Sequence, residues 1–230
     1  MIFAPPAPTL AATSDGRTFP VRRLFCIGRN YAAHTREMGR DPDAEPPFFF
    51  TKWAEAVVPS GTSIAYPAQT RDFQFEAELV VALSGGGRNI VPEQALDHVY
   101  GYAAGLDMTR RDLQAEAKTL ARPWDVAKNF EQSAPLGIIR PASEIGHLQR
   151  GSISLEVDGD VRQSGDLSEM IWPVADVIAY ISRFYCLEPG DLVYTGTPAG
   201  VGPVEIGQNI AVLIDGLAPL QIHVGPRLED

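Results

Sequence analysis

Cysteine is scarce in this chain of 230 residues, which contains only Cys26 and Cys186, far apart in the sequence. Two separated thiols exclude a disulfide framework, a zinc site built on cysteines and a C-x-x-C redox motif. No apolar run approaches the ~18–20 residues that cross a bilayer. Residues 1–12 contain no basic side chain, which excludes a signal peptide. We therefore expect a cytoplasmic protein that has no membrane partner.

Basic residues are outnumbered, with 19 lysines and arginines against 29 acidic residues and a formal net charge of −10. This balance excludes nucleic acid as the main partner, because phosphate binding needs a basic face. The glycine-rich run 190–202 has no Gly-Lys-Ser/Thr and no helix pattern after it, so it is not a nucleotide loop. Gly85–Gly87 opens no G-x-G-x-x-G helix either. A local basic pocket for a small anion remains compatible with the sequence.

Apolar residues make up 45% of the chain, enough for one core, and 21 glycines and 19 prolines indicate many turns. We predict an N-terminal arm over residues 1–17 and a single domain over 18–230, with an α+β, β-rich fold. Strands are expected over 18–27, 48–50, 73–84 and 99–108. Helices are expected over 31–38, 109–120 and 173–185, with a short one after Val91 and a loop over 41–47. Hairpins are expected at Asp158-Gly159 and Asp215-Gly216.

Two glutamates stand in the strongest predicted strand, residues 73–84. Because strand side chains alternate, Glu76 and Glu78 point to the same face, ~7 Å apart along the chain, while the alternate positions are apolar. Neighbouring carboxylates repel unless a cation lies between them. Mg²⁺ or Mn²⁺ takes carboxylate oxygens and keeps open positions for a substrate. The alternative is a solvated outer face, which Val80 and Ala82 disfavour because they continue the glutamate face.

Asp107 ends the second glycine-spaced apolar strand. It suits either a third metal ligand or an N-cap for the helix that follows, and three carboxylates with water form a typical Mg²⁺ set. Within that helix we expect Thr109 to act as the cap, with Asp112 in the capping-box position.

His34 and Glu37 are three residues apart in a predicted helix and therefore share a face. A carboxylate that orients an imidazole makes a general base for water, while the alternative is an exposed ion pair. Lys128 lies in an apolar context, where a lysine either extends to solvent or neutralises a substrate carboxylate, and Arg29 has the same two interpretations. The glycine-rich run favours a tight active-site loop that offers backbone N–H groups and the Thr197 hydroxyl.

Taken together, these segments resemble the fumarylacetoacetate hydrolase family from about Phe19 to Val224. The matching motifs, in order, are Cys26–Tyr31 leading into His34–Met38, Glu76-Ala77-Glu78, Gly101–Thr109 with Asp107, the Lys128 segment and Tyr194–Pro198. The resemblance implies the family's mixed β-sandwich roll, which is usually assembled as a homodimer.

The resemblance also implies a role for each candidate residue. The implied ligands of Mg²⁺ or Mn²⁺ are Glu76, Glu78 and Asp107. The implied catalytic residues are His34 with Glu37, which activate water, and Lys128, which contacts the substrate or oxygens at the metal. The implied substrate-binding residues are Arg29, Lys52, Arg111, Gln114 and Thr197.

Within the family, the runs Gly28–Phe50 and Arg110–Lys118, with Pro123-Trp124, are most similar to bacterial fumarylpyruvate hydrolases, which serve gentisate-type degradation of aromatic compounds. This similarity implies hydrolysis of a carbon–carbon bond in a small β-diketo acid, fumarylpyruvate, to fumarate and pyruvate. Water activated by His34 attacks the 4-oxo carbon, and pyruvate leaves as its enolate. The alternatives are an acylpyruvase or oxaloacetate decarboxylase, and a non-catalytic metal-binding domain of the same fold.

The sequence departs from the family pattern in two places. Close relatives often carry two histidines where Gln74 and Phe75 stand, and Gln74 shares the predicted metal face. Relatives also often have Lys-Pro where this chain has Lys52-Trp53, so Trp53 is expected to reshape the mouth of the pocket. Both departures bear on which acyl group is preferred.

Overall fold

The structure, a computed structural model, describes residues 2, 4, 7–39 and 48–227. The eight-stranded sheet has the order β4 (Phe48–Lys52), β3 (Arg23–Gly28), β15 (Asp191–Tyr194), β8 (Ala77–Leu83), β9 (Val99–Leu106), β11 (Ala134–Leu136) and β5 (Val57–Pro59), with β12 (Arg140–Pro141) beside β9. The five-stranded sheet has the order β14 (Asp160–Asp166), β13 (Ser152–Val157), β17 (Asn209–Ile214), β18 (Leu220–Gly225) and β6 (Ser63–Ala65).

Two small sheets and the helices complete the fold. The three-stranded sheet has the order β10 (Thr109–Arg110), β7 (Phe73–Phe75) and β16 (Gly202–Pro203), and β1 (Leu10–Ala12) pairs with β2 (Thr18–Pro20). The α-helices are α1 (Ala32–Glu37), α2 (Pro92–Ala95), α3 (Arg111–Thr119), α4 (Asp125–Lys128), α5 (Ala142–Ile145) and α6 (Val174–Ser182). The 3₁₀ turns are η1 (Ala54–Ala56), η2 (Leu96–His98) and η3 (Leu167–Glu169). None of the helices in the described part of the chain is long and apolar enough to cross a membrane.

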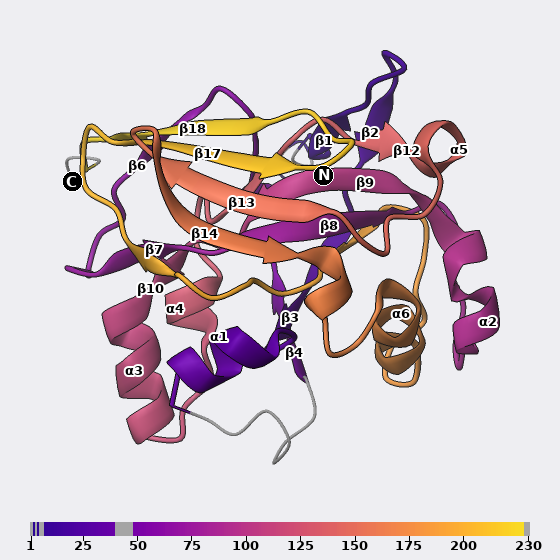
Figure 1. Cartoon of the computed structure of the whole chain (residues 1–230), viewed down its shortest axis with the longest axis horizontal. Helices are drawn as coiled ribbons and strands as arrows, with labels where there is room; N and C mark the ends of the chain where they lie inside the picture. The colour runs from indigo at the N-terminus through magenta and orange to yellow at the C-terminus, as the bar shows by residue number, and fades with distance from the viewer. Residues whose placement is uncertain (1, 3, 5–6, 40–47, 228–230) are drawn as a thin grey trace.

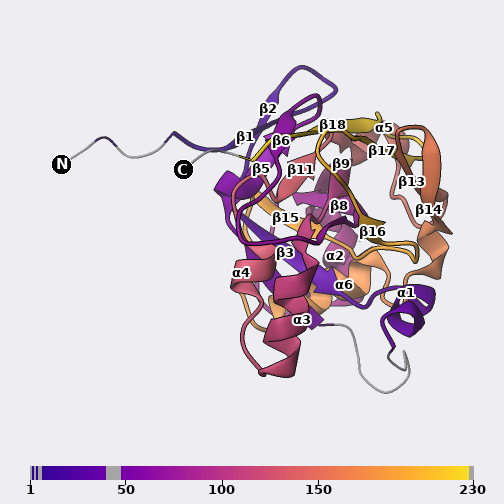
Figure 2. The same cartoon turned by 90° about the vertical axis from the view of Figure 1, so that its left-hand side faces the viewer.

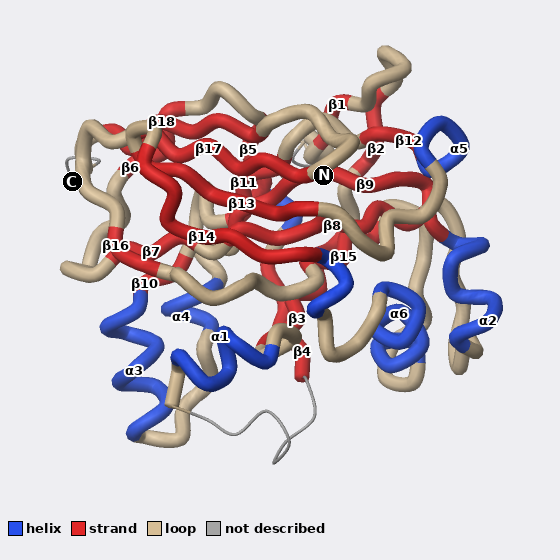
Figure 3. The backbone as a smooth tube through the Cα atoms, viewed as in Figure 1, coloured by secondary structure: helices blue, strands red, loops and turns tan. Residues whose placement is uncertain are grey.

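The two large sheets pack against each other, with strands layered at the centre and helices at the periphery (Figure 3). One core cluster combines β8 residues such as Leu79 and Val81 with β13 residues such as Ile153 and Leu155. Figures 1 and 2 both show α1, α3 and α4 in the lower half of the molecule, beneath the five-stranded sheet. The predicted α+β, β-rich sandwich roll is confirmed.

The alternation predicted for the glutamate-bearing strand is confirmed in β8. Leu79 and Val81 belong to the core cluster between the two large sheets, whereas Val80 and Ala82 belong to a second cluster on the other face. Because both faces of β8 are apolar and covered, the alternative of a solvated glutamate face is wrong. Glu78 is therefore a carboxylate inside the protein, and burying it requires compensation.

The long strand predicted over residues 73–84 is broken at Glu76. Residues before the break form β7 in the three-stranded sheet, and residues after it form β8 in the eight-stranded sheet. At the break, the side-chain Oε1 of Gln163 accepts the Ala77 N–H at 2.9 Å, and the Glu76 carbonyl accepts the Asp107 N–H at 2.9 Å. These two bonds satisfy backbone groups next to the break.

The remaining local predictions have mixed outcomes. The Asp158-Gly159 hairpin is confirmed, with φ of +51° and +88° at its two turn residues, as is the pairing of β17 with β18. The predicted Thr109 cap is wrong, because Arg110 is the N-cap of α3 and no side chain caps it. The loop predicted over 41–47 lies outside the described residues. At the end of the predicted N-terminal arm, β1 pairs with β2.

Candidate active site

Three carboxylates from different parts of the fold meet in the interior. Glu76 lies at the break between β7 and β8, Glu78 lies in β8, and Asp107 directly follows β9. One oxygen from each lies within 4.8 Å of the others, and the three residues are 6%, 1% and 1% exposed. The antiparallel pairing of Glu78 with Gly105 brings the end of β9 beside the glutamates. The alternative of Asp107 as a helix cap is wrong, because Arg110 occupies that position.

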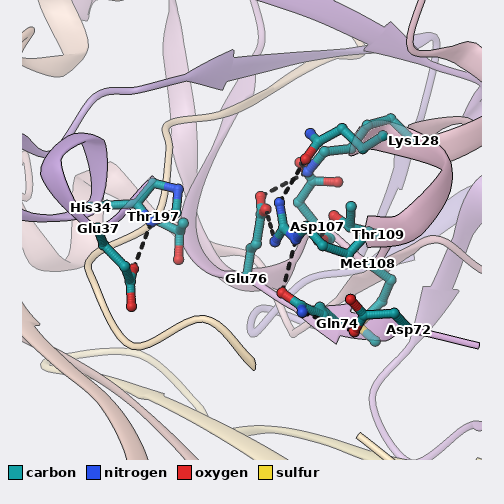
Figure 4. A network of polar contacts seen from close by, with 12 residues as sticks. His34, Glu37, Asp72, Gln74, Glu76, Asp107, Met108, Thr109, Lys128 and Thr197 are labelled. Carbon is teal, nitrogen blue, oxygen red and sulfur yellow. Dashed lines mark hydrogen bonds and ion pairs between the residues drawn. The ribbon is translucent and has the colours of Figure 1, made fainter. Parts of the chain in front are cut away.

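Three buried or nearly buried cations compensate the three carboxylates. Lys128 Nζ lies 2.8 Å from Glu76 Oε2 and 2.7 Å from Asp107 Oδ2 (Figure 4). Lys52 Nζ lies 2.9 Å from Asp107 Oδ1, and Arg111 Nη2 donates to Glu76 Oε1 at 2.6 Å. The alternative in which Lys128 extends to solvent is wrong, because it is 2% exposed.

Glu78 is the carboxylate of the three that no described cation pairs with directly. Its Oε2 accepts the Gly196 N–H at 2.8 Å, and no described residue donates to Oε1. Burial and the neighbouring Asp107 and Glu76 carboxylates raise the pKa of Glu78 well above its usual range. Burial also opposes ionisation of Glu76, but Lys128 and Arg111 outweigh it and hold the pKa of Glu76 well below its usual range.

The donor set fits a hard divalent ion. Buried Asp107 Oδ1 has no hydrogen bond in the described part of the chain, although it faces the Lys52 ammonium. Together with Glu76 and Glu78, that oxygen belongs to a set made only of carboxylates, which are the ligands that Mg²⁺ and Mn²⁺ prefer. A cation would also relieve the repulsion that raises the pKa of Glu78.

His34 and Glu37 form a contact within α1. His34 Nδ1 lies 3.1 Å from Glu37 Oε2, which leaves Nε2 as the nitrogen that can exchange a proton with water. His34 is 7% exposed, so the alternative of an exposed pair is wrong for the imidazole. The Gly200 N–H donates to Glu37 Oε1 at 3.0 Å and so fixes the carboxylate from the other side.

A cavity of about 150 Å³ adjoins Glu76, Glu78 and His34. The predicted site residues that line it are Arg29, His34, Glu76, Glu78, Arg111, Gln114, Lys128 and Thr197. In Figure 4, His34 and Thr197 lie on one side of Glu76 and Lys128 lies on the other. Lys52 does not line the cavity, contrary to the prediction. It is 2% exposed and donates to the Ser133 carbonyl at 2.9 Å, so it supports Asp107 from within the core.

The loop over residues 195–202 supplies backbone donors, as predicted, but to site carboxylates. Gly196 and Gly200 both have a φ of +97°, which favours glycine, and their N–H groups bind Glu78 and Glu37 respectively. A Cβ at Gly196 would meet Asn30 Cβ at 2.8 Å. The Thr197 hydroxyl accepts from Gln163 Nε2 at 2.8 Å, which fixes its orientation at the cavity wall.

Several cavity and support residues escaped prediction. Gln163, 1% exposed, links the break before Ala77 to Thr197, and nothing in its hairpin sequence signals that role. The unpredicted lining residues are Ile27, Gly28, Met38, Phe48, Phe50, Lys118 and Trp124. Lys118 could have been predicted as a cavity residue, because it lies seven residues after Arg111 and therefore on the same helix face.

The two departures from the family pattern have different outcomes. Gln74 Oε1 accepts from Arg111 Nε at 2.8 Å, so it acts on Glu76 through that arginine. Phe75 is 1% exposed and belongs to the core. Trp53 is 54% exposed and does not line the cavity, so the expectation that it reshapes the mouth is wrong.

Comparison with known proteins places this geometry in a family. The chain is 44% identical over 191 residues to a fumarylpyruvate hydrolase of Ralstonia sp, covering 82% of this chain and 99% of the relative. It is 41% identical over 197 residues to a mitochondrial oxaloacetate decarboxylase of Dictyostelium discoideum, covering 85% and 90%. A crystal structure of fumarylpyruvate hydrolase from Pseudomonas aeruginosa in complex with Mn²⁺ and pyruvate superposes with a TM-score of 0.97 at 52% identity, covering 99% of this chain and 100% of that one. The model of the fumarylacetoacetate hydrolase C-terminal family matches residues 23–225. The chain therefore belongs to the fumarylacetoacetate hydrolase family.

Proposed function

We propose that this protein is a metal-dependent hydrolase that cleaves fumarylpyruvate to fumarate and pyruvate. The observation that carries the proposal is the buried triad of Glu76, Glu78 and Asp107 beside a cavity that His34 also lines. The relatives named fumarylpyruvate hydrolase support the substrate, and the one solved with Mn²⁺ and pyruvate supports both the metal and the product.

The triad would hold Mg²⁺ or Mn²⁺, which supplies the positive charge that stabilises the enolate of the departing pyruvate. His34 Nε2 takes a proton from water while Glu37 holds the imidazole at Nδ1. The oxygen of that water bonds to the 4-oxo carbon, and the bond between C3 and C4 breaks with its electron pair going to the pyruvate fragment. The proton on His34 then returns to the products.

Buried lysine and arginine side chains stabilise two of the carboxylates that would bind the metal. Arg111 and Lys128 hold Glu76 ionised, and Lys52 holds Asp107 from the core. Arg29 and Gln114 line the cavity and supply donors for the substrate oxygens.

The decisive experiment follows the enol ultraviolet absorbance of fumarylpyruvate with chelator-stripped protein and with the same protein reloaded with Mg²⁺ or Mn²⁺. Decay that depends on the metal, with fumarate and pyruvate as products, supports the proposal. Absence of decay with the reloaded protein overturns it.

The second candidate is decarboxylation of oxaloacetate, which the Dictyostelium discoideum relative favours. It uses the same stabilised enolate but needs no attacking water. Activity on oxaloacetate that survives replacement of His34 by alanine would favour it over hydrolysis.

The homodimer and the role in degradation of aromatic compounds also remain proposals. Phe184 and Tyr185 are 54% and 39% exposed and pack against Phe49 of the edge strand β4. Such a dimer would have apolar surface to cover there. Light scattering during size-exclusion chromatography tests it, with a mass of 24.9 kDa expected if the protein is a monomer.

A further inference from the structure

One face of α3 forms a wall of the cavity. Arg111, Gln114 and Lys118 stand at positions i, i+3 and i+7 of this helix, and all three line the cavity. From Arg111 to Lys118 the helix rises ~10.5 Å, so the three side chains follow one another from the carboxylate triad outward. Arg111 and Gln114 are buried, while Lys118 lies partly in solvent at the outer end of the wall.

The side chains at the inner end of this wall already form hydrogen bonds and ion pairs with other protein side chains. Arg111 donates to Glu76, Gln74 and Gln114, at 2.6, 2.8 and 2.8 Å. Lys128, which also faces the cavity, is bound to two carboxylates. Because these cations already donate to the proposed metal ligands and to neighbouring side chains, they have few donors left for a second, distant anionic group.

Lys118 differs from these cations because no described carboxylate lies within ion-pair distance of it. Its Nζ lies 5.1 Å from the centroid of the Trp124 ring, which confines the ammonium at the cavity wall. Partial burial and the nearby cations Arg111, Lys128 and Arg29 lower the pKa of Lys118 to about 8. An anion placed beside Lys118 would therefore meet a positive potential, which the Glu76 carboxylate offsets only in part.

We propose that Lys118 binds the second carboxylate of the substrate, at the acyl end, and so selects dicarboxylic over monocarboxylic β-diketo acids. The inference rests on the proposed function, in which the pyruvoyl end lies at the triad. A seven-carbon diketo diacid spans roughly 7.5 Å between its carboxyl carbons on standard bond lengths. A lysine at the outer end of the wall can reach that group.

The charge balance of the site favours the same class of substrate. Glu76, Glu78 and Asp107 are offset by Lys52, Lys128 and Arg111. A divalent ion adds two positive charges to this balanced cluster, and Lys118 adds another. A dianionic substrate compensates that excess better than a monoanion does.

The test compares Lys118→Gln with wild type on fumarylpyruvate and on acetylpyruvate, which lacks the acyl carboxylate, with the metal-loaded protein. We expect the ratio of kcat/KM values, fumarylpyruvate over acetylpyruvate, to fall by about 5- to 30-fold, mainly through KM for fumarylpyruvate. Lys118→Arg should restore most of the ratio. Arg122→Gln is the matched control, because Arg122 is an exposed cation just after the same helix that pairs with Glu116 and does not line the cavity.

A ratio unchanged in Lys118→Gln, or an equal loss on both substrates, overturns the inference while leaving the proposed function intact. If metal-loaded wild type does not hydrolyse fumarylpyruvate, the proposed function itself fails, whether or not acetylpyruvate is cleaved. The two failures are therefore distinguishable in one set of assays.

Discussion

The Gly200 amide donates to both oxygens of Glu37, at 3.0 and 3.2 Å, across 163 residues of sequence. Glu37 in turn contacts His34 Nδ1. The glycine-rich loop therefore fixes the carboxylate that orients the proposed base, and the position of the imidazole depends on the loop backbone as well as on α1.

Gly200→Ala should disturb this support. Its φ is +97°, and a Cβ would meet the Arg162 carbonyl oxygen at 2.2 Å, so the loop must move. We expect kcat/KM to fall by about 10- to 100-fold, because small misplacements of a catalytic group are costly. Gly207→Ala is the matched control, since Gly207 has a φ of +93° but nothing within 4 Å of the added Cβ. Equal activity losses in the two variants would show that backbone strain alone, not the contact with Glu37, matters.

Asp107→Asn tests the coupling between the triad and its buried cations. It should abolish turnover and weaken Mg²⁺ binding in calorimetry. Without metal, we expect the free energy of unfolding to fall by about 3 kcal/mol, because Lys52 and Lys128 lose a buried partner. Relief of the repulsion against Glu78 keeps this loss at the low end of the range for broken buried pairs.

The matched control for that measurement is Glu116→Gln. Its partner Arg122 is 64% exposed, and exposed pairs contribute about 0–1 kcal/mol. Turnover near the wild-type rate in Asp107→Asn would remove Asp107 from the metal site.

The sequence predicted the parts of the site that follow from local periodicity. The common face of Glu78, Val80 and Ala82 depends only on strand alternation, which β8 preserves. The break at Glu76 was not predictable, because it depends on Gln163 reaching the Ala77 N–H across 86 residues. Tertiary hydrogen bonds of this kind produce no periodic pattern in the amino-acid sequence.

Other errors have the same physical origin. The Thr109 cap fails because β10 pairs with β7 there, and the strand ladder takes precedence over a local capping bond. Asp112, predicted to join that cap, instead accepts from Thr70 and Arg71. Lys52 was expected in the cavity wall, but only the packed core shows that it lies against Asp107.

His34→Ala should separate hydrolysis from metal binding. Loss of the proposed general base is expected to lower kcat for fumarylpyruvate by about 10²- to 10⁴-fold, while Mg²⁺ affinity remains because His34 is not one of the three carboxylate residues. His223→Ala, at an exposed histidine in β18, is the control. An unchanged rate in His34→Ala would exclude this residue as the base.

Asp112→Asn should make stability less dependent on pH. Burial alone would raise the pKa of Asp112, but hydrogen bonds from the Thr70 hydroxyl and the Arg71 amide hold that pKa below its usual value. A carboxyl with a lowered pKa stabilises the fold above its unfolded pKa and loses that contribution as the pH falls. Because solvent screens this partly exposed carboxyl, we expect wild type to exceed Asp112→Asn by only about 0.5–1 kcal/mol in free energy of unfolding at pH 7, with the difference shrinking below about pH 4. Urea titrations at several pH values check this, with exposed Asp97→Asn as the control, and a constant difference would contradict it.

The break at Glu76 places the carboxylate triad at the junction between two sheets. Glu76 sits where the chain passes from the three-stranded to the eight-stranded sheet, while Glu78 and Asp107 adjoin the larger sheet. An ion bound by all three carboxylates would therefore link the two sheets and oppose separation of β7 from β8. Bound metal would then slow local opening of the small sheet, so slower hydrogen exchange of the β7 amides would report metal occupancy.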